Sequence, residues 1–523
     1  MKICYISPPD KSKIEADIEY CYNAYNVPHL GLGYIVSYLK KIGFEVEYFE
    51  CVGQRIKLEK LFSIIQEKQY DVIGISSYDY NSYNLVRIVE RIKQICPHAF
   101  IILGGYYATL NYKNLLETLD IDCCVCGEGE ETNLELLQRL NLGLPYQDIR
   151  GIAYKKDGHA IKNENRPLIM DLDALPFPER PFIARRKMAT LATARGCYGC
   201  CSFCSIRAFY QDLTGPRIRF RSPENIVEEI ALLIEHRGVR FINFVDDNFV
   251  VNTPQNISRL NRLCDLLEAS RFDFQFSITV RANDYIKNED LLKRLQQVGL
   301  KYVFIGIESL IQRQLTLYEK KIEVWENEEA FRLSKRLNLK VDIGFILFDP
   351  FVKLDEVIYN IEALLETSYF DFMYAGGYML SMYSALAPVF GSKVRTLLME
   401  KHMYSQQNPF AFQNEDVALC YKLMKIWSMR VYDVNIRYYL IMKAEDLGFE
   451  ELSQRLYCNK VRLAKHDARF IIALCRACME KVVDEDNFDL FMKDWLDELD
   501  EIDQQFRFGE KQLRELVVKG IEK

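Results

Sequence analysis

Four cysteines fall within eight consecutive positions in the segment RGCYGCCSFC, Arg195 to Cys204. They could form two CxxC pairs, Cys197 with Cys200 and Cys201 with Cys204. Zinc sites of that kind need a loop between their ligand pairs, however, and here no residue separates the pairs. The other spacing is CxxxCxxC, with Cys197, Cys201 and Cys204 as ligands and Cys200 left over. Three thiolates on a short loop can hold three irons of a 4Fe-4S cluster and leave the fourth iron open for chemistry.

The composition is that of an ordinary globular protein, since 49% of the 523 residues are hydrophobic and 27% are charged. The formal net charge of −7 gives no basic footprint for nucleic acid. The longest apolar stretches are shorter than the ~18 residues of a membrane span, and the N-terminus has no signal-peptide features. We therefore expect a cytoplasmic protein with no nucleic-acid or membrane partner. In that compartment the sixteen cysteines stay reduced, and a tight cluster of them is expected to bind metal.

Residues 1–140 alternate five short β-rich runs with helical patterns, which predicts a doubly wound, Rossmann-like parallel sheet. Ligands of such sheets bind beyond the carboxyl ends of the strands. Small and polar residues stand at these ends, and they are either ligand contacts or ordinary turn residues: Ser76, Ser77, Gly104, Gly105, Gly127, Glu128 and Gly129.

Three further segments follow along the chain. Residues 141–187 read as a connector, with a hairpin and a Pro-rich stretch. Residues 188–385 repeat βα units five or six times, which predicts a partial (β/α)6 barrel with its chemistry at the carboxyl ends of the strands. The cysteine loop follows the first of these strands. Residues 386–523 read as an all-α region, and its last amphipathic helix either packs on the body with a solvated acidic face or docks a basic partner.

Taken together with the CxxxCxxC loop, several segments between residues 1 and 375 resemble the radical S-adenosylmethionine enzymes, and within them the subclass with an N-terminal cobalamin-binding domain. These segments are PHLGLGYIVSYLKKIGFEV, DVIGISS, IILGGYYATL, VCGEGEET, LPFPERP, FVDDNF, IGIES and GFILFDPF. The resemblance implies that Cys197, Cys201 and Cys204 hold a 4Fe-4S cluster whose open iron chelates S-adenosylmethionine. It also implies that the N-terminal strand ends bind cobalamin.

The resemblance assigns further residues to S-adenosylmethionine. The segment Asp246, Asp247, Asn248 would meet the methionyl amine, because carboxylates suit an ammonium group. Arg281 would pair with the methionyl carboxylate, and Glu308 would accept hydrogen bonds from ribose hydroxyls. For each of these, the alternative is a structural ion pair at the barrel rim.

One departure concerns cobalt. Cobalamin domains with a histidine ligand carry DxHxxG, and no histidine here lies in that pattern. His29, in PHLGLG, comes nearest and is better interpreted as a turn residue, so the axial ligand stays open. No second cluster is expected from Cys420, Cys458, Cys475 and Cys478, because their spacing is sparse.

The function that these features predict is a cobalamin-dependent radical enzyme, most simply a methyltransferase. It would methylate an unactivated carbon of a small-molecule or peptide substrate through a 5'-deoxyadenosyl radical, with electrons from a donor such as flavodoxin or ferredoxin. No residue is assigned a catalytic role. Three alternatives stay open: a cobalamin-containing cyclase or rearrangement enzyme, a radical enzyme whose N-terminal domain binds no cobalamin, and a non-catalytic metal-cluster protein.

Overall fold

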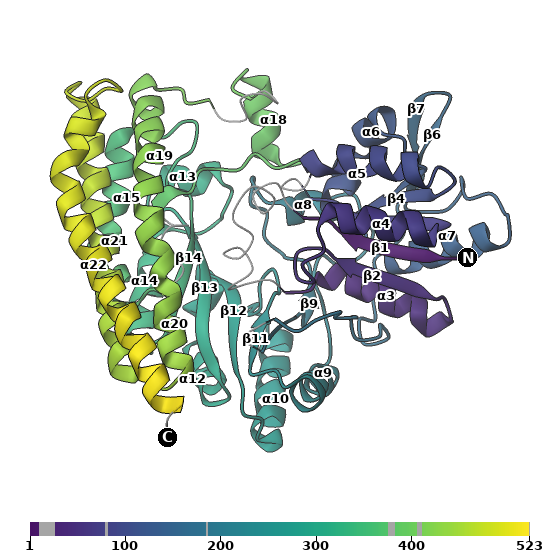
Figure 1. The fold of residues 1–523 in the computed structure, drawn as a ribbon, viewed down its shortest axis with the longest axis horizontal. Helices are drawn as coiled ribbons and strands as arrows, with labels where there is room; N and C mark the ends of the chain where they lie inside the picture. Colours follow the sequence, from purple (N-terminus) through teal and green to yellow (C-terminus); the bar gives the residue numbers. More distant parts are fainter. Residues whose placement is uncertain (10–26, 79–81, 185–186, 375–381, 405–410, 522–523) are drawn as a thin grey trace.

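The computed structural model describes residues 1–9, 27–78, 82–184, 187–374, 382–404 and 411–521 (Figure 1). In order along the molecule it shows an N-terminal sheet, a central barrel segment and a C-terminal bundle of long helices. The predicted fold class is confirmed. None of the described helices is both long enough and apolar enough to cross a membrane.

The N-terminal sheet has seven strands in the order β2-β1-β3-β4-β5-β6-β7. Five strands are parallel, and the hairpin β6–β7 is added antiparallel at the β5 edge. The hairpin turns at Asp157 and Gly158, both with positive φ, as predicted for that segment. The strands are β1 (Ile3–Ser7), β2 (Val46–Glu50), β3 (Val72–Ser76), β4 (Phe100–Gly104), β5 (Cys123–Val125), β6 (Ile152–Lys156) and β7 (His159–Lys162).

Both faces of the parallel part of this sheet are covered, so its five strands are largely buried, whereas β6 and β7 are partly exposed. Alternate residues of β1 enter separate cores: Cys4 and Ile6 lie in one, and Ile3 and Tyr5 lie in the other. This is the doubly wound arrangement. The first core is shared with α4 (Leu58–Lys68), α5 (Ser82–Ile95) and α6 (Tyr106–Thr118), and the second with α3 (Leu30–Ile42) and α7 (Glu130–Asn141).

The central segment is a parallel sheet of five strands in the order β14-β13-β12-β11-β8. Its strands are β8 (Met188–Leu191), β11 (Phe241–Phe244), β12 (Gln275–Arg281), β13 (Leu300–Glu308) and β14 (Lys340–Phe345). The sixth strand predicted near YFDFMYAGG is, among the described residues, only a bridge between Val341 and Met373 beside the short helix α16 (Tyr369–Phe372). Residues 375–381 lie outside the described part.

Helices cover the outside of this barrel segment, and their starts follow local sequence signals. Ser222 caps α9 and Thr253 caps α10, each by accepting a backbone N–H, and a proline follows each cap at the first helical position. The covering helices are α9 (Pro223–Arg237), α10 (Pro254–Ser270), α12 (Glu289–Gln297), α14 (Val324–Arg336) and α15 (Leu354–Glu366).

Helices α19, α20, α21 and α22 stand beside β14, on the side of the barrel away from the N-terminal sheet, whereas α18 lies apart from them, toward the N-terminal domain (Figure 1). Helix α21 packs against α15, α19, α20 and α22. In its core, Cys420 Sγ lies 3.6 Å from Cys475 Sγ. Phe488, Ile502 and Phe506 of α22 are buried, as the amphipathic pattern predicted. These elements are α18 (Lys393–Glu400), α19 (Glu415–Asn435), η2 (Ile436–Tyr438), α20 (Tyr439–Asp446), α21 (Glu450–Met479) and α22 (Phe488–Ile521).

Candidate functional site

A cavity of about 410 Å³ lies between the N-terminal sheet and the barrel segment. One side is built from the carboxyl ends of the sheet strands, and the other from residues that flank the cysteine loop. Of the residues predicted to bind a cofactor, seven line this cavity: Ser76, Gly104, Gly105, Gly127, Glu128, Gly129 and Asp247. The cavity therefore joins the predicted cobalamin region to the predicted S-adenosylmethionine region.

Glycine is required where β4 turns into α6. Gly105 has φ 95°, and a Cβ there would lie 2.8 Å from the Ser77 carbonyl oxygen. The Ser77 hydroxyl donates to the Gly104 carbonyl (2.8 Å) and accepts from Ala108 N–H (3.0 Å). Ser77 thus stabilises the turn through hydrogen bonds and does not line the cavity. Gly104 and Gly105 line it and expose their backbone to it.

Aromatic rings form one wall of the cavity. His29, Tyr78, Tyr106, Phe209 and Tyr210 follow one another with centroid separations of 5.2, 6.2, 4.5 and 5.0 Å. The first three come from the N-terminal sheet and the last two from the barrel segment. Sequence reasoning did not assign these aromatics to the site, although Tyr78 and Tyr106 directly follow predicted strand ends.

His29 is the N-cap of α3, which fits its interpretation as a turn residue. Its Nδ1 accepts from Leu32 N–H (3.0 Å), and its Nε2 faces the Tyr78 hydroxyl. Burial lowers the pKa of His29 to about 4, against a backbone hydrogen bond that raises it, so the ring is neutral at pH 7.

The cysteine loop leaves the short strand β9 (Ala194–Arg195), which pairs with β10 (Arg219–Phe220). Gly196 must be glycine, because a Cβ there would lie 1.9 Å from the Arg217 carbonyl oxygen. Cys204 ends the loop as the N-cap of α8 (Ser205–Tyr210). The predicted ligands are therefore fixed at both ends of the loop by regular structure.

The three predicted ligand thiols are electrostatic neighbours. Burial raises the pKa of Cys197 to about 11, and the Cys204 charge adds to this rise. Burial also raises the pKa of Cys204, with Cys201 contributing in the same direction. The Cys200 sulfur instead accepts from Arg217 Nη1 at 3.5 Å. Among the described residues, no three Cys, His, Asp or Glu side chains converge on one metal ion, but the ligands of a cluster each bind a different iron.

Hydrogen-bond donors face two of these sulfurs. Gly199 N–H donates to Cys197 Sγ, and Arg281 Nη1 donates to Cys201 Sγ, both at 3.3 Å. Such donors and a nearby cation stabilise thiolates and tune the potential of a cluster. The loop therefore fits a 4Fe-4S cluster, and the ligand assignment stays a prediction.

The three residues of the segment Asp246, Asp247, Asn248 have different roles. Asp246 is buried and accepts from Thr193 N–H (2.7 Å) and Ala194 N–H (2.5 Å), so it secures the strand that leads into the cysteine loop. Burial raises the pKa of Asp246 to about 6, against the opposing charge of Arg259. Asn248 is buried and accepts from Arg281 N–H (3.0 Å).

Asp247 is the member of this segment that lines the cavity. Burial, and then the charge of Asp246, raise the pKa of Asp247 to about 7, and a hydrogen bond from the Gly196 backbone only partly offsets them. A carboxylate this poorly solvated gains strongly from a cationic ligand. Asp247 is thus better placed than Asp246 to bind an ammonium group.

Arg281 and Glu308 lie at neighbouring strand ends. The Arg281 guanidinium also donates to the Lys320 carbonyl, and its Nε is buried without a partner among the described atoms. Glu308 has φ 65° and accepts from Lys320 Nζ at 2.8 Å. A non-glycine residue in this region of φ is strained and is often functional. Lys320 was not predicted, because no motif in the sequence marks it.

Ion pairs connect the cavity wall to the cysteine loop. Glu128 accepts from Arg219 (2.8 and 2.9 Å) and lies 3.2 Å from Arg195. Arg195 also donates to Glu130 at 2.6 Å and stacks over the Tyr34 ring at 5.0 Å. Glu128 was predicted as a cobalamin contact. It lines the cavity, but its carboxylate is engaged by these arginines.

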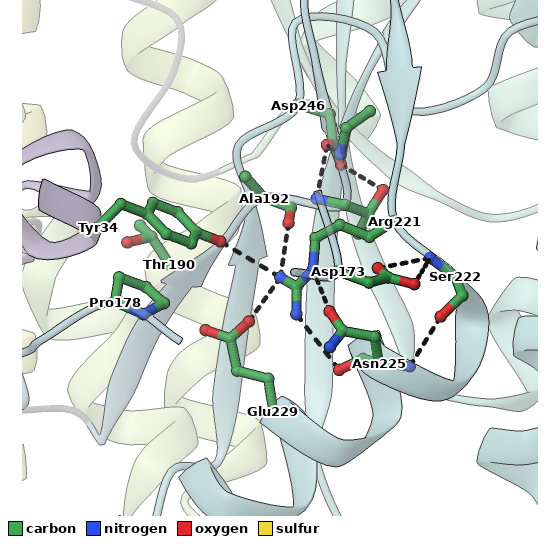
Figure 2. Close-up of polar contacts among 12 residues, drawn as sticks. Tyr34, Asp173, Pro178, Thr190, Ala192, Arg221, Ser222, Asn225, Glu229 and Asp246 are labelled. Carbon is green, nitrogen blue, oxygen red and sulfur yellow. Dashed lines mark hydrogen bonds and ion pairs between the residues drawn. The ribbon is translucent and has the colours of Figure 1, made fainter. Parts of the chain in front are cut away.

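A second buried network lies next to the first (Figure 2). The Arg221 guanidinium donates to Glu229 (2.6 Å), to the Ala192 carbonyl (2.9 Å) and toward the Tyr34 hydroxyl (3.4 Å). Glu229 also accepts from Arg180 at 2.5 Å. Tyr34 belongs to α3 and Ala192 directly follows β8, so this network joins the N-terminal sheet to the first strand of the barrel.

Comparisons with known proteins agree with this architecture. Residues 23–137 match the family model of the B12 binding domain, and residues 191–363 match that of the Radical SAM superfamily. An uncharacterized methyltransferase of Pyrococcus horikoshii is 28% identical over 374 residues, which cover 70% of this chain and 77% of the relative.

Two further matches are a cyclase and a solved structure. An anaerobic magnesium-protoporphyrin IX monomethyl ester cyclase of Cereibacter sphaeroides is 26% identical over 61% of this chain, and the match spans only 53% of the cyclase. The structure of the cobalamin-dependent S-adenosylmethionine radical enzyme OxsB, with aqua-cobalamin and S-adenosylmethionine bound, matches with a TM-score of 0.73 at 17% identity. It covers 99% of this chain and 81% of OxsB, and it shows a common fold.

The cysteine loop lies inside the matched radical region, and the cavity is walled by strand ends of the matched B12 region. The chain is therefore an enzyme of the radical S-adenosylmethionine superfamily. It belongs to the members with an N-terminal B12-binding domain, whose cofactors are S-adenosylmethionine, cobalamin and a 4Fe-4S cluster.

Proposed function

We propose that this enzyme transfers a methyl group to an unactivated carbon of a small-molecule or peptide substrate. The observation that carries the proposal is the shared cavity, in which strand ends of the B12-binding domain face Asp247 and Gly196 beside the cysteine loop. The methyltransferase relative supports it, because that match spans 77% of the relative's length, whereas the cyclase match spans 53%.

The chain's own residues would bind and orient the reactants. Cys197, Cys201 and Cys204 would hold the cluster. Asp247 would hold the methionyl ammonium of S-adenosylmethionine, and Arg281 the carboxylate. When bound, the cluster supplies one electron and cobalamin supplies a methyl carrier.

Water must be kept from such chemistry. The aromatic wall from His29 to Tyr210 is apolar apart from its hydroxyls and its one imidazole, and it closes the side of the cavity that spans both domains. Glu308 and Lys320 neutralise each other at the barrel mouth, and Glu308 would accept from the ribose hydroxyls.

The proposed chemistry also bears on the cellular compartment and the partners of the enzyme. We place the enzyme in the reducing cytoplasm, because the cysteines that the structure describes are free thiols and the cluster needs three of them reduced. The electron would come from a donor such as flavodoxin or ferredoxin. Nucleic acid is not expected as a partner of a chain with net charge −7.

The test begins with anaerobic reconstitution with iron, sulfide and hydroxocobalamin. Corrin absorbance retained after gel filtration supports the cobalamin domain, and its loss supports a domain that only gates the barrel. Incubation with reductant, substrate candidates and methyl-labelled S-adenosylmethionine should give both 5'-deoxyadenosine and S-adenosylhomocysteine, and a product heavier by one labelled methyl group. 5'-Deoxyadenosine alone, with an unlabelled product, would point to a cyclase or rearrangement enzyme. Neither compound would point to a non-catalytic cluster protein.

A further inference from the structure

The tip of the cysteine loop reaches the protein surface. Tyr198 is 37% exposed and Cys200 is partly exposed, whereas Cys201, the next residue, is buried. Two predicted cluster ligands, Cys197 and Cys201, flank this tip directly. A molecule that contacts Tyr198 or Cys200 therefore touches the residue next to a ligand.

Basic side chains stand around the tip. Arg217 is exposed and donates to Cys200 Sγ at 3.5 Å. Lys321 is also exposed, and it follows Lys320, whose carbonyl accepts from Arg281 beside the loop. In the part of the chain that the structure describes, neither Arg217 nor Lys321 has a carboxylate within ion-pair distance. Their charges are therefore not neutralised locally.

Two more cations complete the surface. Arg207 donates to the Cys200 carbonyl and pairs with Glu319 at 2.7 Å, and Lys393 at the start of α18 pairs with the same Glu319 at 2.8 Å. The Glu319 carboxylate therefore pairs with both Arg207 and Lys393. Asp284 is the carboxylate that contacts the tip itself: it accepts from the Tyr198 hydroxyl at 2.6 Å and is 3% exposed.

We call Arg207, Arg217, Lys321 and Lys393 the basic rim. With Glu319 and Asp284 counted against it, the rim has four positive and two negative charges, in a chain whose formal net charge is −7. A local positive field on an acidic protein attracts acidic partners to this spot and repels them elsewhere.

We propose that the loop tip and the basic rim are the docking surface for an acidic one-electron carrier protein of the flavodoxin kind. The proposal rests on the proposed function, in which the cluster must be reduced by one electron before it cleaves S-adenosylmethionine. The carrier loses that electron and the cluster gains it, and no bond or proton is exchanged between the two proteins. Charge attraction at the rim raises the rate of productive encounter.

The test compares two double variants of the reconstituted holoenzyme. Arg217→Glu with Lys321→Glu reverses the two unpaired charges of the rim. Lys60→Glu with Lys155→Glu makes the same charge change at exposed positions on α4 and β6, in the N-terminal domain away from the loop. Each is reduced either by an acidic flavodoxin or by photoreduced deazaflavin, a small molecule that needs no docking surface. Cluster reduction is followed by absorbance, and 5'-deoxyadenosine is counted as a second readout.

The rim variant should be reduced by flavodoxin about tenfold or more slowly at low salt, and the difference should shrink at high salt as the charges are screened. Its reduction by deazaflavin, and both reactions of the control variant, should match the wild type. An equal loss with deazaflavin, an equal loss in the control variant, or no loss at all would overturn the docking surface. If deazaflavin gives a reduced cluster but no 5'-deoxyadenosine in the wild type, the proposed function fails separately.

Discussion

Glu128 Oε1 lies 3.2 Å from Arg195 Nη1, and this ion pair joins the wall of the cavity to the base of the cysteine loop. Glu128 follows β5 of the N-terminal sheet, and Arg195 ends β9 two residues before Cys197. Both side chains are largely buried, with 7% and 17% exposed. These charges, which little water can screen, hold the cavity wall in place relative to the cysteine loop.

Replacing Glu128 by Gln should destabilise the protein, because Arg195 and Arg219 would lose a shared buried counter-charge. Breaking a buried pair from one side costs about 3 to 5 kcal/mol, whereas an exposed pair is worth about 1 kcal/mol or less. Glu164 pairs with Arg150 at 3.2 Å with both side chains mostly exposed, so Glu164→Gln is the matched control. Thermal unfolding should show a clear fall in Tm for Glu128→Gln and almost none for the control, and equal shifts would refute the role of the pair.

The same pair predicts a pH effect. Burial would raise the pKa of Glu128, but the Arg219 hydrogen bond and the Arg195 charge outweigh it and lower that pKa below its usual value. The stabilisation is therefore present above the unfolded-state pKa of about 4.3 and is lost as the pH falls through the lowered folded pKa. Glu128→Gln should remove this part of the acid sensitivity, which unfolding curves recorded across the acid range can detect.

Asp247 should make S-adenosylmethionine binding depend on pH. Its pKa is about 7, raised by burial and then by Asp246, and only its ionised form attracts an ammonium group. Affinity should rise by up to about tenfold between pH 6 and pH 8, since the ionised fraction grows by that factor. Calorimetry on the apoprotein and on Asp247→Asn measures it, and the variant should bind weakly with a flat profile. The folded state holds this proton more tightly than the unfolded state, so the stability from protonated Asp247 is lost as the pH rises through about 7.

Asp246→Asn is the matched comparison. Its carboxylate accepts three hydrogen bonds from Thr193 and Ala194, so the amide would leave part of this set unmade and cost about 1 to 3 kcal/mol of stability. A variant that keeps its Tm but loses S-adenosylmethionine would show that Asp246, not Asp247, is the ligand.

Two alanine variants test which three cysteines of the loop bind the cluster. Cys201→Ala should abolish the cluster, because it removes one of three ligands. Cys200→Ala should retain the cluster, because the CxxxCxxC spacing leaves that thiol out and it contacts Arg217 instead. Iron and sulfide content, with the electron paramagnetic resonance signal of the reduced cluster, distinguish the variants. The opposite pattern would mean that the ligand spacing is CxxCxxxC.

Features set by neighbouring residues could be predicted from the sequence. Helices α9 and α10 begin at Ser222 and Thr253 because each cap and the proline after it are local signals. Four of the five parallel strands of the N-terminal sheet are almost entirely apolar because both faces are covered, and this is visible in the sequence; β2, which carries Glu47 and Glu50, is the exception. The spacing of the cysteine loop is also a local pattern, and it predicts which three cysteines bind the cluster.

Contacts between distant segments could not be predicted. Glu128 and Arg195 are 67 positions apart, and no pattern relates them. Lys320 carries no motif, yet it pairs with Glu308 across the barrel mouth. The choice between Asp246 and Asp247 was open because successive residues at a strand end point to opposite sides, and only the structure shows which one faces the cavity.

Substitutions at Gly104 can distinguish two reasons for a glycine at this strand end: close approach of a ligand to the backbone, or the geometry of the turn. An added Cβ would meet nothing nearer than the Val125 carbonyl oxygen at 3.9 Å, and the residue has no positive φ, so Gly104→Ala should fold normally and could gain a few tenths of a kcal/mol. The new methyl group would nevertheless stand in the cavity where cobalamin is expected to approach the backbone. Thermal unfolding should therefore show an unchanged Tm for Gly104→Ala. Reconstitution followed by gel filtration should show reduced corrin retention, with less retained still in Gly104→Val.

Gly105→Ala is the contrasting variant. Its φ of 95° and the 2.8 Å contact with Ser77 should lower both Tm and cofactor retention. Full corrin retention in Gly104→Ala would show that the cofactor does not approach this strand end, and the contact assignment at Gly104 would be wrong.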